Sequence, residues 1–200
     1  MLKVGLTGNI GSGKTFVASI FQTLGMPVFF ADNDAKKLYE RDDVKTQLRL
    51  LYGDAIFSNS GELDKKALAG IVFSDEDKLQ KINGLIHPLV RENFINWMNL
   101  RMNASYVIYE AAILFESGHY KNLDNVILVT APEDVRIQRV MDRDGSSREE
   151  VMARISHQMA EEKKIPLADY IIRNDGREMV IPQVMEVHRK LLEISGHKLS

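Results

Sequence analysis

The stretch that most constrains the fold is residues 8–15, which read Gly-Asn-Ile-Gly-Ser-Gly-Lys-Thr. It matches the pattern G-x-x-x-x-G-K-[ST], whose glycines let successive backbone amides turn toward phosphate oxygens. The stretch follows the apolar, β-rich run 2–7 and precedes residues 14–24, whose apolar positions recur at helical spacing. The order strand, loop, helix also aims a helix N-terminus at the bound phosphates. We therefore predict that ATP or GTP binds here with Mg²⁺, with Lys14 reaching the β- and γ-phosphates and the Thr15 hydroxyl ligating the metal.

Further apolar runs predict the rest of a sheet. Strands are expected at 27–31, 105–110, 124–130 and 169–173, and amphipathic helices at 132–143 and 177–195. The repeated order strand, helix, strand favours an α/β fold with a parallel sheet covered by helices on both faces.

Two segments interrupt this order, and we expect them to be a helical insert and a lid within one domain. Residues 32–103 lack a strand pattern; Ser74 ahead of an acidic turn, and His87-Pro88 opening a helix to Arg101, predict helix starts. Residues 144–165 are charged, and Ser147 with Glu150 fits a capping box. The core is then about 1–31, 104–143 and 166–200.

Composition narrows the function classes. The net charge of −2 argues against a protein that coats nucleic acid. With no cysteine, the chain has no disulfide, thiolate metal site or cysteine nucleophile. The N-terminus lacks a signal-peptide pattern and no apolar run is long enough to cross a bilayer, so a cytoplasmic protein without a membrane partner is expected.

Several charged residues are candidates for phosphoryl-transfer chemistry. Asp32 follows the second strand, where a carboxylate could accept a hydroxyl proton or cap a helix. Arg139 and Arg143 lie four apart just before the lid, where they could cover the migrating phosphoryl group or end a solvated helix. Glu110 and Glu116 could order Mg²⁺ through water or serve only as capping or surface residues. Arg148 and Arg154, within the lid, have the same two interpretations as the other arginines.

A nucleotide loop, a long helical insert and a short basic lid together favour a small-molecule kinase. The chain contains no Asn-Lys-x-Asp stretch to recognise guanine, which disfavours a regulatory GTPase. A kinase for another acceptor, such as a nucleoside monophosphate or a sugar acid, stays open, as does a non-catalytic nucleotide switch. A nucleic-acid ATPase is disfavoured by charge and length.

An ordered series of motifs across nearly the whole chain resembles the dephospho-coenzyme A kinase family. The Leu-Thr-Gly-Asn-Ile-Gly-Ser-Gly-Lys-Thr stretch resembles that family's phosphate loop. The other matching stretches are Ala-Asp at 31–32, Ile-His-Pro-Leu-Val at 86–90, Ala-Ile-Leu-Phe-Glu at 112–116, Arg-Val-Met-Asp-Arg-Asp at 139–144, Ser-Arg-Glu-Glu at 147–150, Ile-Ser-His-Gln at 155–158 and Ala-Asp-Tyr-Ile-Ile-Arg-Asn-Asp-Gly at 168–176.

The resemblance implies a P-loop kinase fold with a five-stranded parallel sheet, and transfer of the ATP γ-phosphoryl group to the ribose 3′-hydroxyl of dephospho-coenzyme A. By the same resemblance, Asp32 is the general base that orients the ribose, and Lys14 and Arg143 stabilise the transferring group. Other roles carried over are an ATP-phosphate cradle of Gly11, Ser12, Gly13, Lys14, Thr15 and Phe16, an adenine-side wall at Asn174, and substrate contacts from His87 and Arg91. From its place before the lid, Arg139 is a further candidate for contacts to the γ-phosphate and substrate.

Two positions depart from the family pattern. Phe30 stands where the family often has a first aspartate, and Ala112 stands where it often has proline. The first departure puts a second carboxylate near the base in doubt, and the second puts the loop geometry in doubt. The basic side chains Lys36, Lys37, Lys65 and Lys66 are available to hold the pyrophosphate of the substrate, although surface solvation is the simpler role for each.

Overall fold

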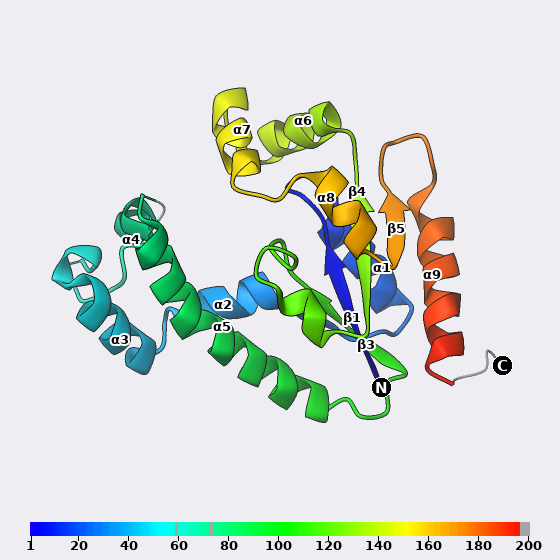
Figure 1. Ribbon diagram of the computed structural model, residues 1–200, viewed down its shortest axis with the longest axis horizontal. Helices are drawn as coiled ribbons and strands as arrows, with labels where there is room; N and C mark the ends of the chain where they lie inside the picture. The colour runs from blue at the N-terminus through cyan, green and yellow to red at the C-terminus, as the bar shows by residue number, and fades with distance from the viewer. Residues whose placement is uncertain (59, 73, 197–200) are drawn as a thin grey trace. The chain divides into compact units, whose positions relative to one another are not determined.

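The computed structural model describes residues 1–58, 60–72 and 74–196. The chain divides into two compact units: one comprises Met1–Phe30 and the residues from Arg101 on, and the other comprises Ala31–Leu100 (Figure 1). The sequence suggested an insert at 32–103. Across the described ranges, no helix is long and apolar enough to cross a membrane.

The first unit is built on a five-stranded sheet in the order β2-β3-β1-β4-β5, with every neighbouring pair parallel. This confirms the predicted α/β fold. The first strand has its predicted bounds, and the other four are one residue shorter at one or both ends. The second strand ends at Phe30 because Ala31 already belongs to the next helix. The strands are β1 (Leu2–Thr7), β2 (Val28–Phe30), β3 (Tyr106–Glu110), β4 (Asn125–Thr130) and β5 (Tyr170–Arg173).

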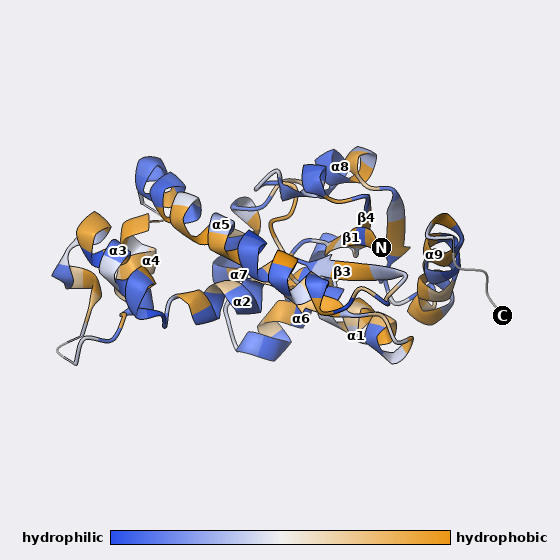
Figure 2. Cartoon of the chain, turned by 90° about the horizontal axis from the view of Figure 1, so that it is seen from below, coloured by the Kyte–Doolittle hydropathy of each residue, from blue (hydrophilic) through white to orange (hydrophobic). Residues whose placement is uncertain are grey.

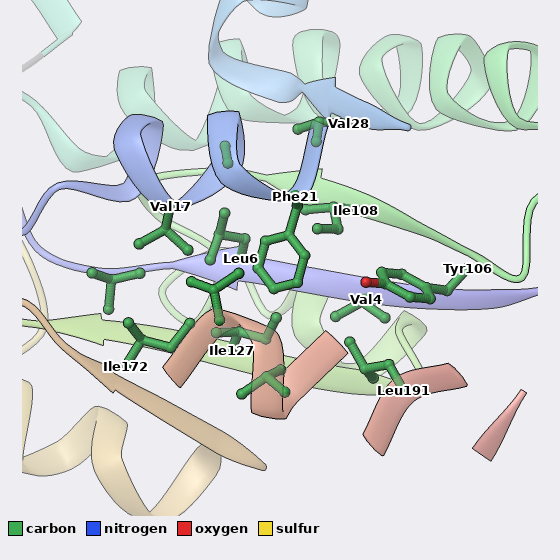
Figure 3. Packing of buried hydrophobic residues seen from close by; sticks show 14 of the residues in the cluster. Val4, Leu6, Val17, Phe21, Val28, Tyr106, Ile108, Ile127, Ile172 and Leu191 are labelled. Atoms are coloured by element: carbon green, nitrogen blue, oxygen red, sulfur yellow. The ribbon is translucent and has the colours of Figure 1, made fainter. Parts of the chain in front are cut away.

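One face of the sheet holds the main hydrophobic core, shown in Figure 3. Alternate residues of the strands, such as Val4 and Ile127, point to this face and are fully buried. Helices α1 (Lys14–Thr23) and α9 (Val180–Ile194) cover it. Phe21 of α1 meets Tyr106 edge to face, with ring centroids 6.4 Å apart. The helix that follows the phosphate loop is therefore fixed to the sheet by its buried face.

The opposite face is packed closely over the centre of β1. A Cβ atom on Gly5 would lie 2.6 Å from Leu114 and 2.9 Å from Leu123, so a larger residue at position 5 would force these side chains to shift. Both leucines come from the connection between β3 and β4, which contains the short helix η2 (His119–Asn122). This connection also carries Glu116, which pairs with Lys164 of α8.

The remaining helices of the first unit follow β4 and β5. Ser147 caps α7 and accepts from the Glu150 amide, while the Glu150 carboxylate accepts from the Ser147 amide, so the predicted capping box is confirmed. In Figure 2, α8 is hydrophilic and α9 has one hydrophobic and one hydrophilic side. Their bounds are α6 (Glu133–Asp144), α7 (Arg148–Ser156), α8 (Glu161–Lys164) and η3 (Ile165–Leu167).

The second unit is helical, with only an isolated bridge between Phe57 and Leu63 among its described residues. Two predicted helix starts were wrong. Asp75, not Ser74, caps α5 by accepting from the Lys78 amide. His87-Pro88 does not begin a helix, because α5 already runs through it. The elements are α2 (Ala31–Leu38), α3 (Asp42–Tyr52), η1 (Asp54–Ile56), α4 (Lys65–Val72) and α5 (Glu76–Asn99).

Pro88 is tolerated inside α5 at the cost of one backbone hydrogen bond. It has no amide to donate to the carbonyl four residues earlier, which belongs to Gly84. The helix is held on both sides of this gap by a buried stripe at Ile82, Ile86, Val90 and Phe94. Packing of this stripe overrides the local preference of proline for a first turn.

Candidate active site

The phosphate loop joins the carboxyl end of β1 to the first turn of α1. Gly11 and Gly13 have φ values of +80° and +95°, a region that side chains rarely adopt. Gly11 also lies against the backbone of Arg136, whose carbonyl oxygen occupies the space a Cβ atom would need. Gly11 is thus required both by its dihedral angle and by a close neighbour.

Lys14 and Thr15 begin α1. The Lys14 Nζ donates to the Gly8 carbonyl at 3.0 Å, so the side chain folds back over the loop. Thr15 and Phe16 are exposed, whereas Ser12 is fully buried. The Ser12 hydroxyl has no hydrogen-bond partner within the described part of the chain. The loop backbone and the start of α1 present an ammonium group and a hydroxyl near the position where phosphate oxygens would bind.

Asn174 ties the loop after β5 to the phosphate loop. Its backbone N–H donates to the Thr130 carbonyl at 2.8 Å, and its side-chain Nδ2 donates to the Ser12 carbonyl at 2.8 Å. Arg139 reaches the same place from α6, donating to Asn174 Oδ1 and to the Gly11 carbonyl, each at 3.4 Å. The structure therefore brings two predicted site residues, Arg139 and Asn174, onto the carbonyl side of the phosphate loop.

Arg143 lies at the end of α6 and is paired with its neighbour. Its Nε and Nη2 donate to the two carboxylate oxygens of Asp144 at 2.7 and 3.0 Å. Arg154 of α7 also donates to Asp144, at 3.0 Å. The hydrogen bond from Arg143 is the main cause that holds the pKa of Asp144 below its usual value. The Arg143 side chain is 64% exposed, so an incoming anion can reach it.

The second unit carries three further predicted site residues. Asp32 lies in the first turn of α2, inside the helix rather than ahead of it as a cap, where a carboxylate is favoured by the helix dipole. His87 and Arg91 lie one turn apart on α5 and so share a face. Burial, and then the positive charge of Arg91, lower the pKa of His87. His87 is therefore neutral at pH 7.

The donor set fits Mg²⁺ bound mainly through a nucleotide. Among the described residues, no group of three or more histidine, cysteine, aspartate or glutamate side chains could enclose a metal ion. Mg²⁺ commonly takes only one or two protein oxygens and completes its shell with phosphate oxygens and water. The exposed Thr15 hydroxyl at the first turn of α1 suits that role.

The model of the dephospho-CoA kinase family matches residues 2–179. The chain belongs to the dephospho-CoA kinase family. Family membership, predicted from the motif series, is thereby confirmed, together with the class of ATP-dependent phosphotransferase.

Relatives and solved structures agree with this assignment. A dephospho-CoA kinase of Bacteroides fragilis is 38% identical over 187 residues, which are 93% of this chain and 91% of the relative. Another, of Chlorobaculum tepidum, is 40% identical and covers 96% of each chain. A crystal structure of a Thermus thermophilus protein superposes with a TM-score of 0.85 at 36% identity, covering 96% of this chain and 97% of the other. Dephospho-CoA kinase from Campylobacter jejuni gives a TM-score of 0.65 at 28% identity, covering 97% of each.

The two departures from the family pattern have structural places. Phe30 is the last residue of β2 and stands beside Glu110 of β3 in the strand register. Ala112 follows β3, and its carbonyl accepts from the Thr7 hydroxyl at 3.5 Å. An alanine thus still allows the loop after β3 to contact the end of β1.

Sequence reasoning missed a second layer of residues behind the phosphate loop. Arg136 of α6 is 4% exposed and donates to the Ala131 carbonyl at 3.0 Å. Lys164 of α8 is completely buried. The stretch Ile-Ser-His-Gln at 155–158 resembles part of the family's lid, but its residue spacing does not predict a contact between Gln158 and the phosphate loop.

Proposed function

We propose that this chain transfers the γ-phosphoryl group of ATP to the ribose 3′-hydroxyl of dephospho-CoA, giving CoA and ADP. Family membership over residues 2–179 is the observation that supports this proposal most directly. The geometry of the phosphate loop supports the ATP half of it, because Lys14 and the start of α1 converge on one anion site.

In the reaction, the 3′-hydroxyl oxygen forms a bond to the γ-phosphorus as the bond to the β–γ bridging oxygen breaks. Asp32 accepts the hydroxyl proton, and ADP leaves with the bridging oxygen. Lys14 and Arg143 stabilise the charge spread over the transferring group. The backbone from Gly11 to Phe16 holds the phosphates, and Asn174 borders the adenine.

Metal and substrate contacts complete the proposal. Mg²⁺, when bound, neutralises phosphate charge and is held by the Thr15 hydroxyl together with the nucleotide. His87 and Arg91 contact dephospho-CoA from α5, where a neutral imidazole and a guanidinium share one helical face. Arg139 was expected to contact the substrate. Its hydrogen bonds to the phosphate loop and to Asn174 support a second role, in which it holds Asn174 beside the nucleotide.

The test is a direct assay with purified protein, ATP, Mg²⁺ and a panel of alcohols, with products identified by mass. We expect CoA to form from dephospho-CoA, with a mass gain of one phosphoryl group and one ADP per CoA. AMP and shikimate serve as matched acceptors for rival kinase activities. Brisk phosphorylation of either, without CoA formation, would reject the proposed acceptor. Nucleotide binding without turnover on any acceptor would favour the nucleotide switch.

A further inference from the structure

The first half of the phosphate loop is held by the lid exit, which we define as residues 158–164 near the end of the predicted lid. The Ile10 amide donates to Gln158 Oε1 at 2.8 Å, across 148 residues of sequence. The neighbouring Asn9 Nδ2 donates to the Met159 carbonyl at 3.4 Å, and Asn9 is only 3% exposed. Two consecutive loop residues are thus bound by two consecutive residues of the lid exit.

The Ile10 side chain strengthens the same connection. It packs against a small hydrophobic cluster formed by Ile137 and Val140 of α6 and Val151 of α7, all fully or almost fully buried. Ile10 is therefore held at its backbone amide by Gln158 and at its side chain by helices α6 and α7. These contacts join α6 and α7 to the backbone immediately before Gly11.

A buried ion pair fixes the lid exit in turn. Glu116 Oε1 accepts from the Met159 amide at 2.9 Å and lies 2.8 Å from Lys164 Nζ. The Lys164 side chain is 0% exposed, and a buried ammonium persists only beside an opposite charge. This pair anchors both ends of the segment 159–164 to the connection after β3.

The contacts of Glu116 argue against its service to a metal ion. Oε1 is already occupied by the Met159 amide and Lys164. Oε2 is buried and makes no hydrogen bond within the described residues. Glu116 therefore faces the interior of the lid exit, where its charge offsets that of Lys164.

We propose that Gln158 is a positioning residue for the phosphate loop, and that the Glu116–Lys164 pair keeps Gln158 in place. This inference rests on the proposed function only in that the loop binds ATP. Gln158 fixes the backbone amide of Ile10, and thereby the position of the loop backbone that leads into the phosphate-binding amides of Gly11 to Phe16. Loss of this contact frees the loop entry and weakens ATP binding, while binding of dephospho-CoA is left as it was.

The decisive variant is Gln158→Met, which keeps the length of the side chain and removes the acceptor. We expect ATP affinity, measured by titration calorimetry, to fall about 5–10-fold, as for the loss of one net hydrogen bond. KM for ATP should rise by a similar factor while KM for dephospho-CoA stays constant. Amide exchange at Ile10, followed by NMR without ligand, should speed up about 5–10-fold for the same reason.

Gln138→Met is the matched control. Gln138 lies on the exposed side of α6, and its side chain donates to Asp142 of the same helix at 2.7 Å. This substitution has the same chemistry but leaves the phosphate loop untouched, so both ATP affinity and Ile10 exchange should match the unmodified protein. If Gln158→Met does not fold, Gln158→Asn, which stays polar but is one methylene shorter, takes its place in the same measurements.

The supporting pair is tested by Lys164→Met combined with Glu116→Leu, which removes both charges together. We expect the double variant to fold and to show the same rise in KM for ATP. Unchanged ATP affinity and unchanged Ile10 exchange in the Gln158 variant would overturn the inference, and unchanged ATP affinity in the folded double variant would remove the ion pair from it. If the unmodified protein binds ATP but makes no CoA, the proposed function fails while the Ile10 exchange result still decides this inference.

Discussion

The side-chain amide of Asn174 lies where a Cβ atom on Gly13 would have to be. The Asn174 Nδ2 is held there by its hydrogen bond to the Ser12 carbonyl, so it cannot move away without breaking that bond. The loop after the last strand therefore closes over the last glycine of the phosphate loop. This contact explains why glycine is needed at position 13 beyond its φ of +95°.

Gly13→Ala should weaken ATP binding about tenfold or more, or ~1.4 kcal/mol, because the new methyl group displaces Asn174 and distorts the loop. Gly25→Ala is the control, since Gly25 also has a positive φ, of +82°, but nothing lies within 4 Å of the added carbon. Both variants should lose about 1–2 kcal/mol of unfolding free energy from the left-handed backbone. Only Gly13→Ala should lose affinity in calorimetric titration; equal affinity in both would show that Asn174 does not enforce the glycine.

Asp32→Asn should lower kcat by about 10²-fold or more, because an amide cannot accept the hydroxyl proton. ATP affinity should stay nearly unchanged. Asp42→Asn, at the exposed start of α3, removes a carboxylate from a comparable helix position and should leave kcat unchanged. Steady-state kinetics with both substrates varied measures the effect, and normal turnover in Asp32→Asn would remove this residue from the mechanism.

Arg143→Met should lower kcat by about 10²-fold, the usual loss when one charge-stabilising donor is removed from a transition state. Arg154→Met removes the other arginine that contacts Asp144 and is the matched comparison. We expect a much smaller loss there, because no contact to the reacting group is assigned to Arg154. Equal losses in single-turnover measurements would mean that the two arginines act only by shaping the lid.

Lowering the pH should destabilise the protein through buried histidines. Burial lowers the pKa of His188, whose Nδ1 lies 2.5 Å from the Tyr106 hydroxyl, and His87 is shifted in the same direction. As the pH falls, the histidines of the unfolded chain take up protons before those of the folded protein do, because their pKa is higher. The stability contributed by neutral histidine is therefore full above about pH 6.5 and is lost as the pH falls toward the lower pKa of the folded state.

Denaturant unfolding at a series of pH values checks this dependence. His188→Gln should flatten the fall in unfolding free energy below about pH 6.5. Tyr106→Phe removes the partner hydroxyl and keeps the histidine, so it should lower stability at every pH without flattening the slope. A slope that is unchanged in His188→Gln would show that this histidine does not titrate in the unfolding transition.

Local patterns predicted the sheet because each strand is a short apolar run closed by polar or turn residues. The capping box at Ser147 and Glu150 was equally readable, since it depends on residues three apart. Pro88 misled the prediction because proline is favoured in a first turn, and only the buried stripe of α5 shows that the helix began earlier.

The candidate site was predictable in its parts and not in its connections. The phosphate loop has a pattern whose spacing indicates its mechanism, so roles for Lys14 and Thr15 could be predicted from sequence. The contact between Ile10 and Gln158 joins residues 148 apart, and no local pattern marks it. The Glu116–Lys164 pair is hidden for a further reason: α8 reads as a solvated, hydrophilic segment, although its last lysine is fully buried.

The bidentate pairing of Arg143 with Asp144 places a carboxylate on the guanidinium that the proposed mechanism assigns to the γ-phosphate. In that mechanism a triphosphate would compete with the Asp144 carboxylate for the guanidinium, and because the Arg143 side chain is 64% exposed the pair is weak enough to exchange. The exchange replaces one anion by another and leaves the arginine neutralised throughout. Such an exchange would tie the placement of this cation to the arrival of the triphosphate.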